Sequence, residues 1–254
     1  MVICSSSNER VKELRKLVKS SKERKEKQMY IVEGIKMFGE IPEPDICDIY
    51  VCESAIDKYG EKLPSRYHVL SDSVFKSVSD TEAPQGIMAL VKMKSYTLDS
   101  ICTGENPFIL IIERLQDPGN MGTIIRSAEA AGVSGIMLSQ GCADIYSPKV
   151  VRSTMGSLFR MPVFLSENLP DDIDSLKKKD ITVYGAHLNG DSMYSMDFTR
   201  PVAFLIGNEG KGLSEDTGNA ADFLLKIPMR GSVESLNAAV SASIIAYEVL
   251  RQRL

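Results

Sequence analysis

The sequence contains no long apolar run. Across its 254 residues, no stretch approaches the roughly 18 consecutive apolar residues that a membrane-spanning helix requires. The opening residues, MVICSSSNERVKELRK, also lack an apolar run of signal-peptide length. These two absences predict a cytoplasmic protein that has no contact with a membrane.

Cysteine and histidine are too few and too scattered for metal or disulfide chemistry. The five cysteines include no CxxC pair, and only His68 and His187 are available beside them. A zinc site or a framework of disulfide bonds is therefore not expected. The sequence predicts no metal cofactor and no redox-active centre.

The sequence also lacks two common nucleotide-binding signatures. Residues 207–212, GNEGKG, hold three glycines in six residues, which lets a ligand approach the backbone closely. Their spacing matches neither the phosphate-binding loop GxxxxGK[ST] nor the dinucleotide signature GxGxxG. This argues against one alternative for the chain, a nucleotide-dependent enzyme that binds ATP or NAD.

Charge is distributed unevenly along the chain. The net charge is -4, yet residues 9–27 hold nine lysines and arginines against four glutamates, a local balance of +5. Such asymmetry suggests a basic arm that faces a polyanion such as RNA, and the alternative is a solvated helix face with Glu–Lys pairs. The candidate RNA contacts are Arg10, Lys12, Arg15, Lys16, Lys22, Arg24 and Lys25.

Hydrophobic periodicity in the N-terminal part predicts a small α/β domain over residues 1–95. Apolar residues at helical spacing make residues 9–27 an amphipathic helix. A second helix is expected to open at residues 33–37. Short strands are predicted at 29–32, 46–52, 67–70 and 86–91. Residues 96–106 are polar without strong periodicity, which predicts a linker.

From residue 107 onward, apolar strand-like runs alternate with helical segments. The predicted strands are Phe108–Ile112, Ile136–Ser139, Met161–Leu165, Ile181–Ala186, Val202–Ile206 and Phe223–Ile227. Helices are predicted at about 121–131, 148–157, 168–179, 213–219 and 235–252. Several strands are apolar throughout, which is typical of central parallel strands covered on both faces. Ligands of such sheets gather beyond the carboxyl ends of the strands.

Three segments that follow predicted strands carry polar residues where a ligand is expected. Asn120 and Arg126 follow the first strand, Glu209 follows Val202–Ile206, and Ser235 and Asn237 follow the last strand. Taken singly, each of the first four has a structural alternative: Asn120 and Ser235 as helix N-caps, Arg126 as a surface arginine, and Glu209 as a solvated loop residue. The final helix is apolar or small nearly all round, which predicts burial in the core or against a second subunit.

The three segments DPGNMGTIIRSA (117–128), FLIGNEGKGL (204–213) and IPMRGSVESLNAAV (227–240) resemble the three motifs of the SpoU/TrmH family of SPOUT methyltransferases. The stretch SPKVVRSTMGSLF (147–159) is similar to that family's connecting segment. The resemblance covers residues 107–254, and residues 1–95 are similar, more loosely, to the small RNA-binding domain that often precedes it. It implies an α/β domain whose C-terminal segment forms a trefoil knot, a feature that pattern reasoning alone excludes by default.

The resemblance also implies an activity. It indicates an S-adenosylmethionine-dependent enzyme that methylates a ribose 2′-hydroxyl of ribosomal or transfer RNA, with 23S rRNA favoured and DNA not expected as a partner. It implies a homodimer, and the alternative is a non-catalytic RNA-binding protein of the same fold, such as a ribosome assembly factor. The implied cofactor contacts are Gly207, Ile227, Met229 and Leu236, and the implied catalytic residues are Arg126, Asn120, Glu209, Ser235 and Asn237.

Physical chemistry limits what Arg126 can do in such a site. A guanidinium group keeps its proton, since its pKa lies above about 12, so it is a poor general base. We therefore interpret Arg126 as a bidentate clamp on an RNA phosphate that orients the nucleotide. In this interpretation Asn120 and Asn237 position the ribose and Arg126, and Glu209 holds the loop or another group of the site. The group that accepts the proton is left open.

Overall fold

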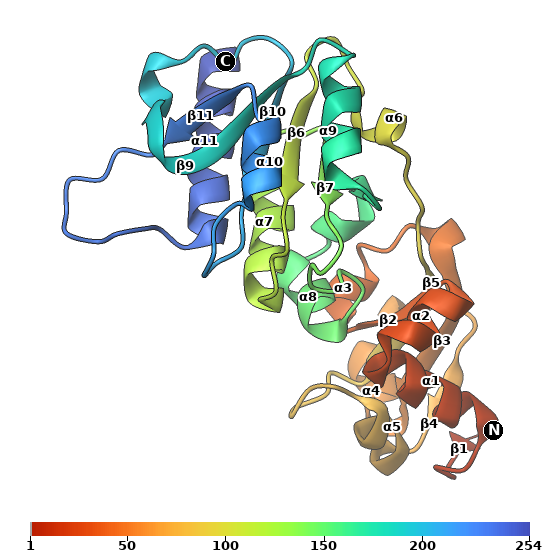
Figure 1. The fold of residues 1–254 in the computed structure, drawn as a ribbon. Coiled ribbons are helices and arrows are strands. Elements are labelled where there is room, and N and C mark those ends of the chain that lie inside the picture. Colours follow the sequence, from red (N-terminus) through yellow and green to blue (C-terminus); the bar gives the residue numbers. More distant parts are fainter. Residues whose placement is uncertain (1) are drawn as a thin grey trace. The chain divides into compact units, whose positions relative to one another are not determined.

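The computed structural model describes residues 2–254, which form two compact units (Figure 1). The first unit holds residues 2–94 together with 144–159, and the second holds residues 95–143 and 160–254. The predicted boundaries placed residues 144–159 in the C-terminal domain. They group with the first unit because helix α8 (Pro148–Thr154) packs on strand β2 (Met29–Glu33). The boundaries 1–95, 96–106 and 107–254 therefore remain predictions from the sequence.

The first unit is built on a five-stranded mixed sheet in the order β1-β4-β3-β5-β2. Strands β1, β4 and β3 run parallel, and β5 runs antiparallel to both β3 and β2. The remaining strands are β1 (Val2–Ile3), β3 (Ile46–Cys52), β4 (His68–Leu70) and β5 (Ile87–Lys92). The helices are α1 (Glu9–Lys19), α2 (Ser21–Lys27), α3 (Ile35–Phe38), α4 (Glu53–Tyr59) and α5 (Asp72–Val78), with short 3-10 turns at Glu43–Asp45, Gly60–Lys62 and Ser157–Phe159.

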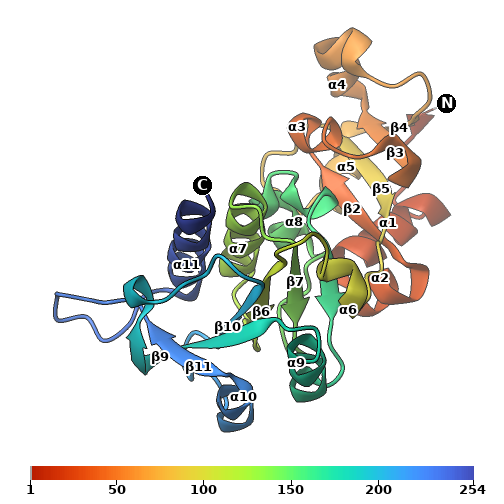
Figure 2. The same ribbon diagram turned by 90° about the horizontal axis from the view of Figure 1, so that it is seen from above.

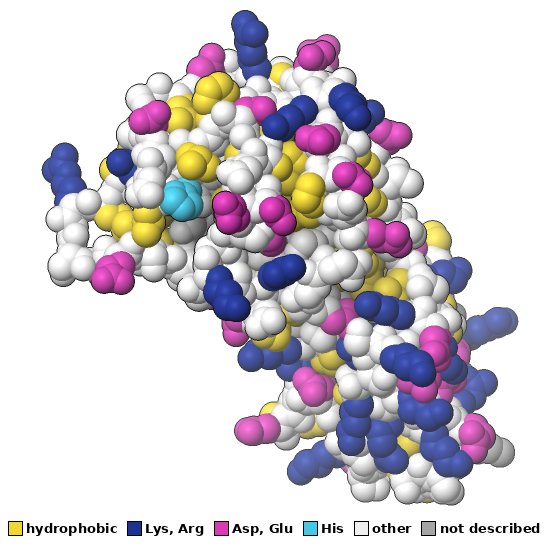
Figure 3. Space-filling model, in the orientation of Figure 1, with side chains coloured by type: hydrophobic (Ala, Val, Ile, Leu, Met, Phe, Trp, Pro, Cys, Tyr) yellow, Lys and Arg dark blue, Asp and Glu magenta, His cyan; other side chains and the backbone are white. Residues whose placement is uncertain are grey.

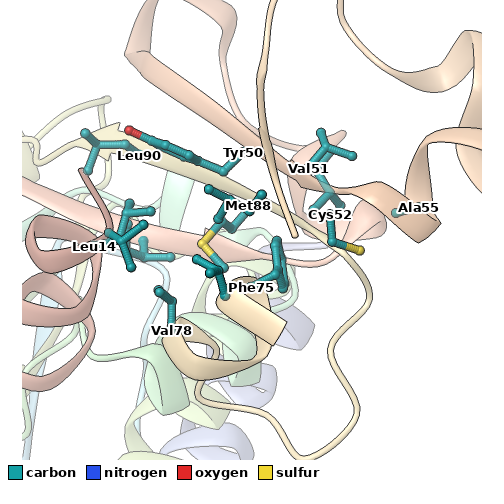
Figure 4. Packing of buried hydrophobic residues seen from close by; sticks show 14 of the residues in the cluster. Leu14, Tyr50, Val51, Cys52, Ala55, Phe75, Val78, Met88 and Leu90 are labelled. Atoms are coloured by element: carbon teal, nitrogen blue, oxygen red, sulfur yellow. The ribbon is translucent and has the colours of Figure 1, made fainter. Parts of the chain in front are cut away.

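The core of the first unit lies between this sheet and helices α1 and α5. Figure 4 shows Leu14 of α1 and Phe75 of α5 pointing toward Met88 of β5, and all three side chains are buried. Tyr50 of β3 joins the same cluster. Burial of such apolar side chains is the main favourable contribution to folding of a unit of this size.

The basic segment is two helices, so the prediction of one continuous helix over residues 9–27 is wrong. Ser20 ends α1 in an extended conformation, with φ -121° and ψ 116°. Its hydroxyl then accepts a hydrogen bond from the Glu23 N–H and caps the start of α2. A serine that caps a new helix breaks the old one, because its backbone must leave the helical region.

The second unit contains a six-stranded parallel sheet in the order β11-β9-β10-β6-β7-β8, which confirms the predicted parallel α/β fold. Its two central strands, β6 (Phe108–Ile112) and β10 (Val202–Ile206), are buried at every residue. Continuous apolar runs are what such doubly covered strands require. The other strands are β7 (Gly135–Leu138), β8 (Val163–Leu165), β9 (Thr182–Ser192) and β11 (Phe223–Lys226).

Helices cover both faces of this sheet. Figure 2 shows α7 (Pro118–Ala130) and α11 (Ala238–Arg253) on one face, and α9 (Leu169–Lys177) and α10 (Glu215–Ala220) on the other. The predicted linker contains the short helix α6 (Leu98–Ile101), whose Ile101 is fully buried. Gly135 makes room for it, because a Cβ atom at Gly135 would lie 2.5 Å from the Cβ of Ile101. A short 3-10 turn at Met193–Ser195 follows β9.

Residues 2–254 contain neither a membrane-spanning helix nor a metal-binding cluster. No helix in this range has the length and apolar character needed to cross a membrane. No group of three or more His, Cys, Asp and Glu side chains in the same range is arranged to hold a metal ion. The five cysteines are free thiols.

Candidate functional site

A cavity of about 390 Å³ lies in the second unit, beyond the carboxyl ends of β10 and β11. Its walls come chiefly from the loops that follow these two strands, and part of β9 completes them. The volume falls within the range of about 300–1,000 Å³ that small-molecule sites occupy. The predicted cofactor contacts Gly207, Ile227, Met229 and Leu236 all line this cavity.

The loop after β10 closes tightly on itself. Asn208 and Gly212 exchange two backbone hydrogen bonds, 3.0 and 2.9 Å long. Gly207 is required at the start of this loop, because a Cβ atom there would lie 2.2 Å from the carbonyl carbon of Gly212. The Asn208 side-chain oxygen accepts hydrogen bonds from the N–H groups of Gly210 and Lys211. The loop therefore presents a fixed backbone to the cavity.

Glu113 anchors the far end of the same loop, and the sequence reasoning missed it. Glu113 follows β6 and is only 5% exposed. Its carboxylate accepts hydrogen bonds from the Ser214 N–H (2.9 Å), the Ser214 hydroxyl (2.6 Å) and the Thr217 hydroxyl (3.0 Å). A buried carboxylate needs such donors to offset the cost of leaving water. No local pattern around residue 113 signals this role.

Helix α7 begins at Pro118 and is capped by Asp117, so the interpretation of Asn120 as an N-cap is wrong. The Asp117 side chain accepts a hydrogen bond of 2.7 Å from the Asn120 N–H and caps the helix. Pro118 fills the first helical position, where the absence of an N–H costs nothing. The Asp-Pro pair is the sequence signal that identifies this cap. Asn120 is left in the first turn with its side chain available to other groups.

Helix α11 begins at Ala238 and is capped by Asn237, so Ser235 is not the N-cap either. The Asn237 side-chain oxygen accepts hydrogen bonds from the N–H groups of Ala239 (2.9 Å) and Val240 (3.3 Å). Its amide group donates a bond of 3.0 Å to the side-chain oxygen of Asn120. Ser235 lies in the preceding loop, is exposed, and lines the cavity.

Glu209 completes a hydrogen-bonded chain across the three predicted motifs. Its carboxylate accepts bonds from the Asn120 side-chain amide (3.3 Å) and from the N–H groups of Asp117 (3.1 Å) and Gln116 (3.4 Å). Burial raises the pKa of Glu209, but the hydrogen bonds to its carboxylate outweigh that effect and leave the pKa below its ordinary value. Asn237, Asn120 and the ionised carboxylate of Glu209 therefore form one hydrogen-bonded network.

Arg126 lies apart from this network. It is on α7 with an exposed side chain, and among residues 2–254 its guanidinium has no hydrogen-bond or ion-pair partner. It is also absent from the cavity wall. The neighbouring Ser127 accepts a hydrogen bond of 2.9 Å from the Ser243 hydroxyl, which joins α7 to α11. The structure thus brings together Asn120, Glu209 and Asn237, places Ser235 at the cavity, and leaves Arg126 facing outward.

Helix α11 is buried on one face only. Ala239, Ala242 and Ala246 lie in the core, whereas Val240 and Tyr247 are 46% and 52% exposed. These two exposed residues are seven positions apart and therefore share one side of the helix. An apolar strip thus remains uncovered on a helix that the sequence predicts to be buried.

In the first unit, Arg24 does not fit the predicted role of an RNA contact. It is 4% exposed, and its guanidinium donates to Asp144 at 2.6 Å and to the carbonyl oxygens of Leu17 and Val18. A guanidinium that is buried and bonded through all three of its nitrogens is poorly placed to contact a phosphate. Its physical role is to bind residue 144 and to satisfy the end of α1.

Of the other predicted RNA contacts, Arg15 is half-buried and donates to the Ser77 hydroxyl, and the rest are exposed: Arg10, Lys12, Lys16, Lys22 and Lys25. Figure 3 shows Lys and Arg side chains gathered over α1 and α2. Several form the Glu–Lys pairs that the alternative interpretation predicts, such as Lys22 with Glu26 at 3.7 Å. The pairing leaves the ammonium groups accessible, since the Lys22 side chain is 83% exposed. The pairs and a role in binding a polyanion are therefore compatible.

Each of the two units matches a known protein family. Residues 107–247 match the SpoU rRNA Methylase family, and residues 8–89 match the MRM3-like substrate binding domain. The chain is 34% identical over 253 residues to the 23S rRNA (guanosine(2553)-2'-O)-methyltransferase RlmP of Bacillus subtilis, with 96% of this chain and 97% of that protein covered. It is 40% identical over 179 residues to the 23S rRNA (uridine(2479)-2'-O)-methyltransferase of Streptomyces viridochromogenes, with 68% of this chain and 62% of that protein covered.

Solved structures agree with these matches. The SpoU methyltransferase AviRb from Streptomyces viridochromogenes in complex with the cofactor AdoMet has a TM-score of 0.85 and 29% identity, covering 97% of this chain and 98% of that one. The AdoMet-bound rRNA methyltransferase from Sinorhizobium meliloti has a TM-score of 0.86 and 30% identity, covering 100% of this chain and 98% of that one. Both likenesses extend over the two units.

Proposed function

Because this chain belongs to the SpoU rRNA methylase family, we propose that it transfers the methyl group of S-adenosylmethionine to a ribose 2′-hydroxyl of 23S rRNA. The observation that carries the proposal is the hydrogen-bonded network of Asn237, Asn120 and Glu209 beside the cavity. Two relatives named as 23S rRNA 2′-O-methyltransferases support ribosomal over transfer RNA. The alternative of a non-catalytic RNA-binding protein has no support among them.

The cavity suits S-adenosylmethionine in size and chemistry. Ile227, Met229 and Leu236 offer apolar surface for the adenine ring, and the fixed backbone that begins at Gly207 offers polar groups. When bound, the cofactor supplies an activated sulfonium methyl and leaves as a neutral thioether. The two AdoMet-bound relatives support S-adenosylmethionine as the cofactor, and the lining of the cavity supports these four residues as its contacts.

The residues of this chain act on the reaction by alignment. A ribose hydroxyl is a poor nucleophile, so holding it in line with the methyl group is a large part of catalysis. Asn120 uses both its side-chain oxygen and its amide within the network, and so it positions Glu209 and Asn237. We assign Asn120, Asn237 and Glu209 to positioning and Ser235, at the cavity wall, to contact with substrate or cofactor.

Arg126 and Glu209 are both poorly suited to accept the hydroxyl proton. The guanidinium already holds its proton at any physiological pH. The pKa of Glu209 is lowered by the N–H groups that surround its carboxylate, which makes that carboxylate a weak base. We therefore assign Arg126 to an RNA phosphate, as a bidentate clamp, and place the proton acceptor outside this pair.

A homodimer is part of the proposal. The uncovered strip of α11, with Val240 and Tyr247, is suited to pack against a second copy of the chain. Arg126 is exposed on α7, which packs against α11. Light scattering of the purified protein tests the dimer, and a monomer at micromolar concentration contradicts it. The trefoil knot that the family resemblance implies is likewise proposed for the second unit.

The first unit is proposed to bind the RNA substrate. The match of residues 8–89 to a substrate binding domain supports this role, as does the cluster of cations on α1 and α2. Contacts between lysines and phosphates release counterions, so their contribution to affinity falls steeply with salt.

Transfer of a radiolabelled methyl group tests the activity. An unmodified 23S rRNA transcript and a tRNA transcript are each incubated with labelled S-adenosylmethionine and the protein, and the products are digested to nucleosides. Label in a 2′-O-methylnucleoside from the 23S transcript is the expected result. Label on a base, or in tRNA alone, overturns the proposed chemistry or substrate. An absence of both transfer and cofactor binding favours the non-catalytic alternative.

A further inference from the structure

Arg114 has an unusual backbone conformation for a residue with a long side chain. Within residues 2–254 it is one of four non-glycine residues with positive φ, at 50°. The other three lie at the ends of helices: Gln28 and Met155 are C-caps, and Asp180 follows α9. Left-handed residues are common at helix ends, which accounts for those three. Arg114 alone follows a strand.

The left-handed conformation of Arg114 is held from two sides. Its N–H donates a hydrogen bond of 2.9 Å to the Ser139 hydroxyl, and its carbonyl oxygen accepts one of 2.8 Å from the Asn208 side chain. Glycine would adopt this conformation without the steric cost that a Cβ atom brings. Strain that the surroundings hold in place is often found at functional sites. An arginine at this position therefore points to a use for its side chain.

The guanidinium of Arg114 has no partner within the described part of the chain, and its side chain is exposed. The carboxylates nearest to it in sequence are already engaged. Glu113 binds Ser214 and Thr217, and Asp117 caps α7. Arg114 thus keeps an uncompensated positive charge at the carboxyl edge of the sheet, joined through Asn208 to the loop that holds Glu209.

The cofactor does not account for this charge, because Arg114 is absent from the wall of the cavity. We infer that Arg114 binds a phosphate of the RNA substrate next to the nucleotide that is methylated, as a second arginine besides Arg126. The inference rests on the proposed function and adds a residue to it. A guanidinium fork is well matched to phosphate oxygens, and a nearly fixed backbone lowers the entropy cost of making the contact.

The test compares Arg114→Gln, Arg114→Gly and Arg114→Lys with the control Arg200→Gln. Arg200 is also an exposed arginine of the second unit, but it precedes β10 and so lies at the opposite edge of the parallel sheet. Binding of an unmodified 23S rRNA transcript is measured by filter binding at several salt concentrations. Binding of S-adenosylmethionine and thermal unfolding are measured on the same variants.

We expect Arg114→Gln and Arg114→Gly to weaken RNA binding about tenfold or more. The slope of log affinity against log salt should fall by about 1 for each. Arg114→Lys should retain part of the affinity, while Arg200→Gln and all cofactor affinities stay at the wild-type value. Arg114→Gly should melt no lower than Arg114→Gln, because glycine tolerates the positive φ.

Two outcomes overturn the inference. One is RNA binding by Arg114→Gln that equals that of wild type or of Arg200→Gln. The other is a loss of cofactor affinity that matches the loss of RNA affinity, which would assign Arg114 to the cofactor. RNA binding is measured without methyl transfer, so a wild type that binds RNA but forms no product contradicts the proposed function alone.

Discussion

Asn237 donates a hydrogen bond of 3.0 Å to Asn120, although 117 positions separate the two residues in the sequence. Each asparagine lies at the beginning of a helix, Asn120 in the first turn of α7 and Asn237 as the cap of α11. The bond therefore fixes the starts of two helices relative to each other and to Glu209. Changes at any of the three residues should affect the other two.

Asn237→Ala should destabilise the protein by about 1–2 kcal/mol, because α11 loses its cap and Asn120 loses a donor. Asn237→Asp is the matched variant, since a carboxylate still caps the helix but cannot donate to Asn120. Urea unfolding should show that the aspartate variant recovers most of the stability, while methyl transfer stays impaired in both. Full activity of Asn237→Asp would show that the bond between the asparagines is dispensable.

Arg126→Ala should abolish most methyl transfer and leave the affinity for S-adenosylmethionine unchanged, because Arg126 lies outside the cavity wall. Arg126→Lys keeps the charge but loses the two-pronged contact, so we expect it to recover only part of the rate. Single-turnover kinetics measures the rate of methyl transfer, and calorimetry measures the affinity for S-adenosylmethionine. A variant without arginine that retains most of its turnover would refute the role of a phosphate clamp.

Glu209→Gln should lower stability at neutral pH by no more than about 1 kcal/mol, because the carboxylate is partly exposed. The pKa of Glu209 is lowered in the folded protein, so its contribution is present above the pKa of the unfolded chain and is lost as pH falls through the folded pKa. The difference in stability between wild type and variant should therefore be constant from about pH 6 to 8 and shrink once the pH falls below the ordinary glutamate pKa of about 4.3. Urea unfolding of both proteins across this pH range checks the prediction. A stability difference that changes near pH 7 contradicts it.

Glu113→Ala should weaken cofactor binding about tenfold, because Ser214 and Thr217 lose their acceptor and the loop after β10 loses its anchor. Calorimetry with S-adenosylmethionine measures the effect. Glu215→Gln is the control, since Glu215 is exposed and lies in the first turn of α10, the helix that Ser214 caps and that contains Thr217. Equal cofactor affinity in the two variants would show that Glu113 does not position the loop.

Lys22→Gln combined with Lys25→Gln should weaken binding of 23S rRNA and lower the salt slope by about 2, with stability unchanged. Arg24→Gln, one residue away from Lys25, should instead lower stability and leave RNA binding unchanged. It breaks a buried ion pair, which costs about 3–5 kcal/mol of stability. Filter binding and urea unfolding on both proteins separate the two effects, and a stable Arg24→Gln with weakened RNA binding would reverse our assignment.

Much of the second unit could be predicted because its central strands can be recognised from their own apolar residues alone. Phe108–Ile112 and Val202–Ile206 are strands with the predicted bounds, since an uninterrupted apolar run is what a doubly covered strand needs. The starts of the helices were predicted less well. The helices start at Pro118 and Ala238 because Asp117 and Asn237, rather than Asn120 or Ser235, cap them.

Contacts between distant residues could not be predicted from local pattern. Glu113 becomes a buried anchor only because Ser214, 101 positions later, folds against it. Arg24 looks like its basic neighbours in sequence, and only the position of Asp144, 120 residues away, makes it a buried ion pair. The break at Ser20 is similar, since the same serine would be tolerated inside a helix if nothing required the chain to turn.

The cavity is assembled from residues spread between Ala186 and Ser241, and the network beside it begins with Asn120. While the chain is being synthesised, the cavity therefore cannot form in full until residue 241 has left the ribosome. Every shorter nascent chain lacks a complete cavity, even though the strand that follows residue 107 is already present. Cofactor binding should consequently appear in a single late step of translation.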